Sequence, residues 1–206
     1  MISLFIDTST KNVSISIIRD NQILSLISKE IINMHSAYTT KFIKDCLDEA
    51  KIDANDIDDI LVVVGPGSFT GVRIGVTIAK TYGFLIKKDI TPVSSLKMLA
   101  ISSKHDEFIM SIIPANKTSY YVGIYDKDGN EVIDEGCMNK DNVLALCMKY
   151  NPYIVGFDIS IIGEYKINKQ ELDILKIVDY YKDKEKVNCY KIVPNYLKLP
   201  QALESK

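Results

Sequence analysis

The sequence predicts an α/β fold that is built twice along the chain, with the second copy reduced. The first copy runs as three strands, a helix, a strand and a helix, over residues 2–7, 13–18, 22–32, 36–51, 59–64 and 71–87. The second copy repeats three strands, a helix and a strand, over residues 107–114, 120–125, 131–137, 141–150 and 153–157. A repeated element order indicates two related units that each bury one sheet.

Each element of the first copy follows from the spacing of its apolar residues. Apolar and polar side chains alternate between Val13 and Ile18, as in a strand with one buried face. Within residues 36–51 the apolar side chains recur at helical spacing, and Ser36 can cap the start of that helix. A further helix is expected over 94–104, after Pro92.

The second copy follows the same order up to about residue 163 and then loses it. The stretch 164–190 is rich in Lys, Asp and Glu and does not predict a strand followed by a helix. We therefore expect a first lobe of residues 1–104 and a smaller lobe of residues 105–206 with a C-terminal strand. Such a duplicated fold, with a nucleotide cleft between its halves, is typical of actin-like and sugar-kinase-like proteins.

The composition argues against several classes of function. The 206 residues include 25 basic and 27 acidic side chains spread along the chain, so no basic stripe announces stand-alone nucleic-acid binding. The four cysteines are far apart in sequence, which argues against a zinc clip or a disulfide framework. No apolar run reaches the roughly 18–20 residues that span a bilayer, and no signal peptide is recognisable, so we expect a cytoplasmic protein.

A glycine-rich loop joins the buried strand 59–64 to the helix 71–87. Residues 65–75 read Gly-Pro-Gly-Ser-Phe-Thr-Gly-Val-Arg-Ile-Gly. Backbone N–H groups of such a loop can bind a phosphate, and the first candidates here are those of Gly65, Gly67 and Ser68. The spacing matches neither the P-loop nor the dinucleotide fingerprint. A phosphate site and a tight structural turn explain the loop equally well.

The turn after the first strand carries a second candidate for phosphate chemistry. Asp7 can hold a hydrated magnesium ion there, while Thr8 and Ser9 bind phosphate oxygens. The alternative is that the Asp7 carboxylate only caps the turn by accepting backbone N–H groups.

Small residues recur every fourth position along the helix 71–87. They are Gly71, Gly75, Ala79 and Gly83, and they form one stripe on the helix. Because glycine destabilises a helix interior by about 1 kcal/mol relative to alanine, the stripe needs a close neighbour. That neighbour is either a partner protein or the sheet of the same domain.

Several of these residues carry a resemblance to a known family. Residues 65–75 resemble the signature of the TsaB (YeaZ) family, bacterial proteins of the pathway that places threonylcarbamoyl on adenosine 37 of certain tRNAs. Ile6–Thr10 resembles the family's first strand and turn, and His35-Ser36 its His-Ser pair. Residues 194–198, followed by Gln201-Ala202, resemble its C-terminal strand. The match covers residues 2 to about 104 well and the second half thinly.

The resemblance implies a protein that is inactive by itself and acts within an enzyme complex. It implies that the protein binds the catalytic protein TsaD and that the ATPase TsaE joins the complex. It also implies a weak homodimer, and contact with tRNA only through the complex. ATP or ADP would be held only within that complex, and no membrane is involved. The implied interface lies on the helices 36–51 and 71–87 and includes His35, Tyr38, Phe42, Gly71, Arg73, Gly75, Ala79 and Gly83.

The chain departs from its relatives where catalysis would need acidic or metal-binding groups. At the duplicated turn the family tends to show Asp-Ala-Arg and then Glu, but this chain has Pro114-Ala115-Asn116 and Ser119. The histidine pair of TsaD falls on Ser95 and Leu99, so we expect no catalytic residue and no metal site. The rival hypotheses are an active nucleotide-dependent kinase or hydrolase of this fold, and a regulatory homodimer outside tRNA modification.

Overall fold

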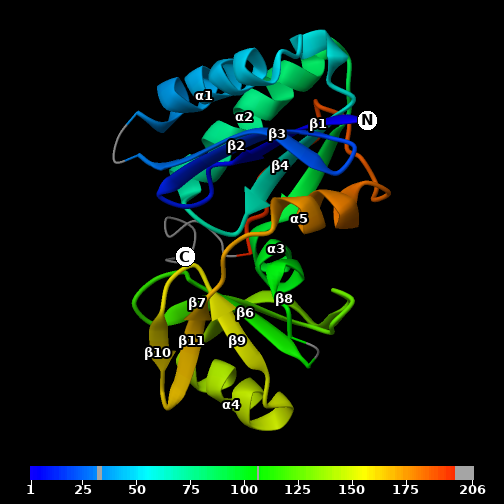
Figure 1. Cartoon of the computed structure of the whole chain (residues 1–206). Coiled ribbons are helices and arrows are strands. Elements are labelled where there is room, and N and C mark those ends of the chain that lie inside the picture. The colour runs from blue at the N-terminus through cyan, green and yellow to red at the C-terminus, as the bar shows by residue number, and fades with distance from the viewer. Residues whose placement is uncertain (32–33, 106, 198–206) are drawn as a thin grey trace. The chain divides into compact units, whose positions relative to one another are not determined.

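The computed structural model describes residues 1–31, 34–105 and 107–197, and its chain folds into two compact units (Figure 1). Unit 1 contains Met1–Ser95 and Ile174–Asn195, and unit 2 contains Leu96–Asp173 together with Tyr196 and Leu197. The expected lobes were 1–104 and 105–206, so the units are divided differently. The chain leaves unit 1 earlier than expected and returns to it at Ile174.

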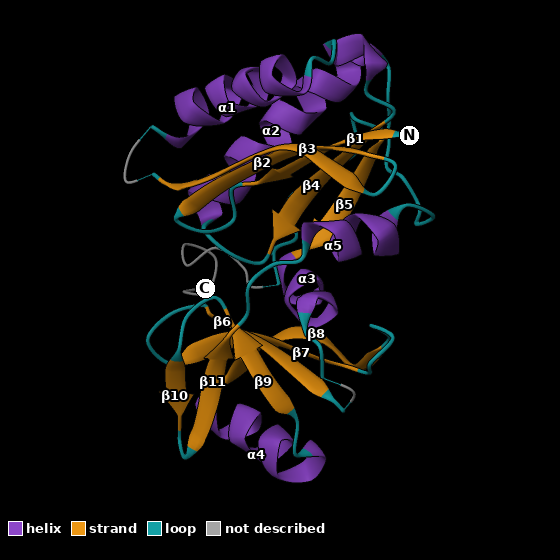
Figure 2. Ribbon diagram, viewed as in Figure 1, coloured by secondary structure: helices purple, strands orange, loops and turns teal. Residues whose placement is uncertain are grey.

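Unit 1 is a five-stranded sheet in the order β3-β2-β1-β4-β5. The strands are β1 (Ile2–Asp7), β2 (Asn12–Arg19), β3 (Gln22–Glu30), β4 (Asp59–Gly65) and β5 (Ile90–Ser94). The first three are antiparallel, whereas β4 and β5 run parallel to β1. Helices α1 (His35–Ala50) and α2 (Phe69–Ile86) lie on one face of the sheet and α5 (Ile174–Tyr181) on the other (Figure 2), and a short 3-10 turn, η1 (Ala54–Asp56), precedes β4.

The core of unit 1 explains why its central strands are almost wholly apolar. Every residue of β4 is buried, because helices cover both faces of the sheet there. Its alternate residues Ile60, Val62 and Val64 pack with Phe42 and Ile43 of α1 and with the buried side of α2. The strand therefore ends at the glycine-rich loop with its position fixed by the core.

Unit 2 is a six-stranded sheet in the order β10-β11-β9-β6-β7-β8. Its strands are β6 (Ile109–Pro114), β7 (Ser119–Tyr125), β8 (Glu131–Asn139), β9 (Tyr153–Gly156), β10 (Ser160–Ile162) and β11 (Tyr165–Lys169), and its helices are α3 (Ser95–Ser102) and α4 (Lys140–Tyr150). Residues of β6 alternate between two clusters: Met110 and Ile112 pack with α4, whereas Ile109 and Ile113 pack with α3. One helix therefore covers each face of this sheet.

The two sheets confirm the duplication. The order β8-β7-β6-β9-β11 repeats β3-β2-β1-β4-β5, with α4 in the place of α1. In unit 1 the 18-residue helix α2 joins β4 to β5, whereas in unit 2 the corresponding connection contains only the short strand β10. The second copy is therefore reduced by the loss of its second helix.

Two expectations for the second half are wrong. The stretch 164–190 does contain a strand and a helix, β11 and α5, although its sequence is rich in charge. The described residues Pro194–Leu197 do not form a strand, and the remaining residues of that expected strand lie outside the described part. Instead, the Asn195 N–H donates a single hydrogen bond to the Val64 carbonyl over 2.8 Å.

The returning segment completes the edge of the sheet in unit 1. The residues Ile90 of β5 and Val187 exchange two backbone hydrogen bonds of 2.9 and 2.8 Å. In addition, the Lys186 ammonium lies 3.0 Å from the fully buried Asp59 carboxylate. The residues after α5 therefore cover the open side of β5.

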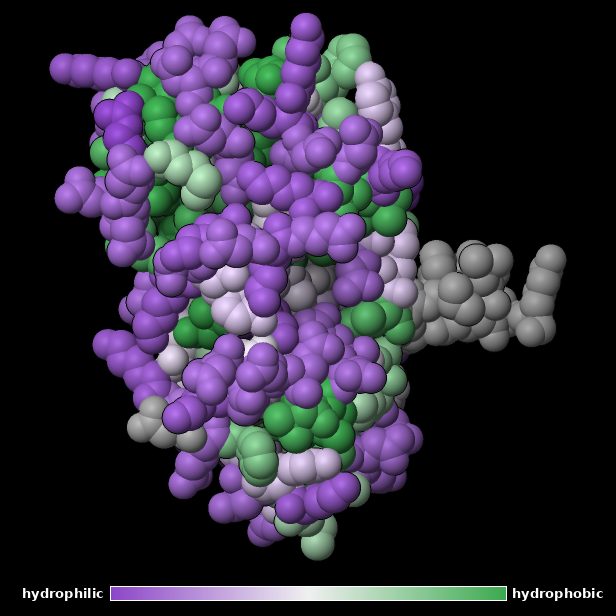
Figure 3. Space-filling view, turned by 90° about the vertical axis from the view of Figure 1, so that its right-hand side faces the viewer, coloured by the Kyte–Doolittle hydropathy of each residue, from purple (hydrophilic) through white to green (hydrophobic). Residues whose placement is uncertain are grey.

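The surface is mostly hydrophilic on the side drawn in Figure 3, where apolar side chains appear as separate patches. Among the described residues, no helix is long and apolar enough to span a membrane.

Candidate functional site

The glycine-rich loop packs directly on the turn after β1. A β-carbon at Gly67 would collide with the Ser9 carbonyl oxygen, and one at Gly71 with that of Thr8. The Ser68 N–H donates to the Ser9 carbonyl over 2.7 Å, and the Thr8 hydroxyl donates to the Gly71 carbonyl over 2.7 Å. These glycines serve a close contact between two chain segments, which favours the structural-turn explanation of the motif.

The start of α2 uses its own side chain as a cap. Ser68 precedes the helix, and its hydroxyl accepts the Gly71 N–H over 3.2 Å. Its carbonyl accepts the Val72 N–H over 2.9 Å. Of the three N–H groups that were expected to bind a phosphate, that of Ser68 therefore already has a partner within the protein, and the next donors along the loop, from Gly71 and Val72, are used to start the helix.

The Asp7 carboxylate is buried, and it caps the turn after β1. One of its oxygens accepts the Ser9 N–H over 2.8 Å. Burial raises the pKa of Asp7, and the hydrogen bond from Ser9 opposes that shift only in part. The Ser9 hydroxyl is buried in the same turn. The capping alternative thus accounts for Asp7.

The small-residue stripe of α2 faces the sheet of its own unit, so the interface prediction for these residues is corrected. Gly71, Gly75, Ala79 and Gly83 are all buried. A β-carbon at Gly75 would collide with the Thr8 hydroxyl oxygen, and one at Gly83 would lie 2.8 Å from the Lys88 carbonyl oxygen. The close neighbour that the glycines require is therefore the protein itself, and no surface remains there for a partner.

The other expected interface residues divide between surface and core. On α1, Tyr38 is 40% exposed and its ring centroid lies 5.7 Å from that of Phe42, which is only 5% exposed. His35 is half-buried at the first position of α1, where its carbonyl accepts the Thr39 hydroxyl over 2.7 Å. Arg73 of α2 is exposed. Phe42 belongs to the core, which corrects its assignment, whereas the other three remain accessible.

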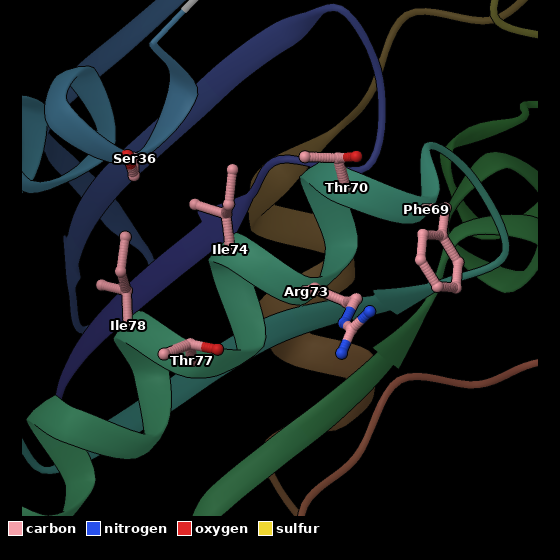
Figure 4. A pocket seen from close by; sticks show the side chains of 7 residues that line it. All are labelled: Ser36, Phe69, Thr70, Arg73, Ile74, Thr77 and Ile78. Carbon is pink, nitrogen blue, oxygen red and sulfur yellow. The ribbon is translucent and has the colours of Figure 1, made fainter.

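An open groove of about 360 Å³ lies between the start of α1 and the outer side of α2 (Figure 4). We call it the α1–α2 groove, and it is lined by Ser36, Phe69, Thr70, Arg73, Ile74, Thr77 and Ile78. The Arg73 guanidinium carbon lies 5.0 Å from the centre of the Phe69 ring, and that ring is 50% exposed. The arrangement offers apolar side chains with one cation, which suits a protein partner better than a small polar ligand.

Sequence reasoning missed most of this groove. Phe69, Ile74 and Ile78 lie on the side of α2 that the small-residue stripe leaves open. The four-residue spacing between Ile74 and Ile78 was the sequence signal of an apolar surface on that side of α2. However, the same step also describes core positions, so it does not distinguish surface from interior.

The described residues contain no group of three or more His, Cys, Asp or Glu side chains that could hold a metal ion. Ser95 and Leu99, where the resemblance suggested that a related protein has histidines, are fully buried residues of α3.

Comparison with known proteins places this architecture in a class and then in a family. The family model described as TsaD, tRNA N6-adenosine threonylcarbamoyltransferase, matches residues 24–198. In structure, the chain is similar to YeaZ from Pseudomonas aeruginosa, with a TM-score of 0.75 at 20% identity over 95% of this chain and 99% of that one. A second Pseudomonas aeruginosa structure, described as similar to peptidase YEAZ, gives a TM-score of 0.80 at 21% identity over 96% and 99%. The chain thus has the fold of the YeaZ structures and belongs to the class of proteins that the TsaD family model describes.

Sequence relatives identify the family within that class. The chain is 31% identical to the tRNA threonylcarbamoyladenosine biosynthesis protein TsaB of Bacillus subtilis, over 98% of this chain and 96% of that protein. A TsaD enzyme of Thermodesulfovibrio yellowstonii is 30% identical but matches only 59% of this chain and 43% of its own length. The protein belongs to the TsaB family.

Proposed function

We propose that this protein acts in the biosynthesis of threonylcarbamoyladenosine in tRNA as a non-catalytic partner of TsaD. The observation that carries the proposal is the match to a TsaB protein along nearly the full length of both chains. The close contact between the glycine-rich loop and the first turn supports a non-catalytic role, because it takes up the Ser68 N–H, one of the groups that would bind a phosphate during phosphoryl transfer. The neutral residues at the duplicated turn of unit 2 support it further.

The α1–α2 groove is the surface that we assign to TsaD. Its apolar side chains come from one helix, α2, with the start of α1 as the opposite wall, so an apolar helix could lie between them. Ile74 and Ile78 would be buried by such a helix, and Arg73 would remain at the rim. A second copy of this protein would compete for the same groove, which would give a weak homodimer. TsaE would then join the complex formed with TsaD.

The test is tRNA threonylcarbamoylation in a reconstituted reaction, with and without this protein. TsaD, TsaE, the threonylcarbamoyl-adenylate synthase, tRNA, threonine, bicarbonate and ATP are held constant. We expect modified tRNA only when this protein is present. Equal modification in its absence would refute the proposed function and leave the fold unaffected.

The groove is tested separately with Ile74→Asp. A carboxylate there would lose its water on binding, so the complex with TsaD should no longer form in size-exclusion chromatography. The matched control is Ile161→Asp, which makes the same change at an isoleucine of unit 2 that is 73% exposed. If both variants fold and both still bind TsaD, the groove is not the interface.

Nucleotide binding separates this proposal from an active kinase or hydrolase. We propose that the protein alone binds no ATP and that any ATP or ADP is held only in the complex. Isothermal titration of the isolated protein with ATP and magnesium should give no binding heat. Binding and turnover that are lost in Asp7→Ala would support the enzyme instead.

A further inference from the structure

A surface of α2 that combines basic and aromatic side chains begins at Phe69 and Arg73, at the rim of the α1–α2 groove, and continues along the helix away from it. Phe69, Arg73, Lys80 and Phe84 recur at helical spacing on one side of this helix, over about 22 Å at 1.5 Å per residue. Tyr190, from the segment after α5, lies beside its C-terminal half, and the exposed Lys191 follows it in the sequence. We call these six residues the basic–aromatic stripe. All of them belong to unit 1.

Contacts within the stripe hold its rings at the surface. The rings of Phe84 and Tyr190 meet edge to face, with centroids 5.8 Å apart and planes at 68°. The Lys80 ammonium donates to the Tyr190 carbonyl over 3.3 Å, which places a cation beside this pair. Phe84 is 56% exposed and Tyr190 68% exposed, so both rings keep a large free surface although they pack on each other.

The charge of the stripe is of one sign. Helix α2 contains no acidic residue, and neither does the stretch 186–197. No ion pair within the described part of the chain involves Arg73, Lys80 or Lys191. The Asp89 carboxylate accepts from the Asn188 side chain over 3.3 Å, two residues before Tyr190. This face of unit 1 therefore carries a local positive charge, although the chain as a whole has a net charge of −2.

We propose that the basic–aromatic stripe binds RNA. Cations interleaved with exposed rings are the combination that holds single-stranded nucleic acid, because the cations contact phosphates while bases stack on the rings. Arg73, Lys80 and Lys191 contact the phosphates, and the ring pair of Phe84 and Tyr190 receives an unpaired base. The inference rests on the proposed function, since tRNA is the RNA that the complex with TsaD would present. This face then supplies part of the tRNA contact in the complex.

The test compares tRNA binding by the assembled complex with TsaD, using an unmodified tRNA transcript that the reconstituted reaction modifies. The variant Lys80→Gln/Lys191→Gln removes two phosphate contacts, so the slope of log affinity against log salt should fall by about 1.4–1.8. Such a change makes binding on the order of 30-fold weaker at 0.1 M salt and leaves it nearly equal at 1 M. The matched control is Lys44→Gln/Lys166→Gln, which removes two exposed lysines that form no ion pair within the described residues.

The aromatic pair has its own readout. Tyr190→Ala should weaken tRNA binding by about fivefold or more at every salt concentration without changing the slope, because stacking involves no counterion release. Wild-type affinity and slope in both stripe variants would overturn the proposal. Loss of assembly with TsaD, with tRNA binding unchanged in any complex that forms, would also overturn it and assign the stripe to a protein partner. Modification that does not depend on the wild-type protein would instead refute the proposed function, which keeps the two failures distinct.

Discussion

The contact between Gly75 and Thr8 offers a sharp test of what the glycine-rich motif does. Gly75 lies inside α2, and a β-carbon there would collide with the Thr8 hydroxyl oxygen. That hydroxyl is fixed, because it donates to the Gly71 carbonyl over 2.7 Å in a buried setting. The substitution Gly75→Ala should therefore destabilise the protein, although alanine is the better helix former.

The magnitude follows from three opposing contributions. Replacing glycine by alanine in a helix stabilises it by about 1 kcal/mol. Overpacking destabilises by about 1–3 kcal/mol, and a buried carbonyl that loses its donor by a further 1–3 kcal/mol or so. The expected net destabilisation is about 3 kcal/mol. In the background Thr8→Ala the obstructing oxygen is absent and the other neighbours of the new carbon lie at 3.6 Å or beyond. There Gly75→Ala should stabilise by about 1 kcal/mol.

The assay is urea unfolding of the four proteins of this double-mutant cycle, followed by far-UV circular dichroism. The coupling free energy between the two positions should be about 4 kcal/mol: the double mutant should be more stable by that amount than the sum of the two single substitutions predicts. If Gly75→Ala is neutral or stabilising in the wild-type background, the close packing of α2 on the first turn is refuted. The motif would then need another explanation, with a bound phosphate as the first candidate.

Three further predictions concern Asp7, the returning segment and the groove. Burial raises the pKa of Asp7, so stability should fall as the pH rises from 3.8 through the raised value. Asp7→Asn should then raise the urea midpoint at pH 7.5 but not at pH 4, and an equal gain at both pH values would contradict this. Lys186→Ala leaves the buried Asp59 carboxylate without its cation and should destabilise by about 2 kcal/mol, below the roughly 3–5 kcal/mol of a fully buried pair because Lys186 is partly exposed, whereas the exposed Lys184→Ala should change little. Excess TsaD should dissociate any homodimer in sedimentation velocity, because both partners use one groove, and a dimer that persists in the complex would refute this.

The fold was predictable wherever the apolar spacing was regular. Alternation in β2, the continuous apolar run of β4 and the helical spacing of α1 and α2 all predicted the elements that the structure contains. The strand β5 was missed because it is short and contains Pro92, which is tolerated there since β5 pairs with only one full strand. The charged sequence around α5 hid a helix whose buried side consists of Ile174, Ile177, Val178 and Tyr181.

The candidate site was predictable only in part, because a sequence pattern does not say which way a helix face points. The four-residue spacing of Gly71, Gly75, Ala79 and Gly83 correctly required a close neighbour but left open which one. The contact between Lys80 and Tyr190 in the basic–aromatic stripe was hidden for another reason. Lys80 and Tyr190 are 110 residues apart in sequence, so no local charge run could reveal that they meet.

The exchange of hydrogen bonds between Ile90 and Val187 has a consequence for synthesis on the ribosome. The edge of β5 stays uncovered until Val187 has emerged from the ribosome. The strands β1–β5 of this sheet are complete at Ser94, long before that point. An uncovered edge of a partly apolar sheet is a template for pairing with another nascent chain. We expect a chaperone to associate with ribosome-bound chains that end before residue 187 and to leave soon after that residue emerges. Selective ribosome profiling would locate that point of release.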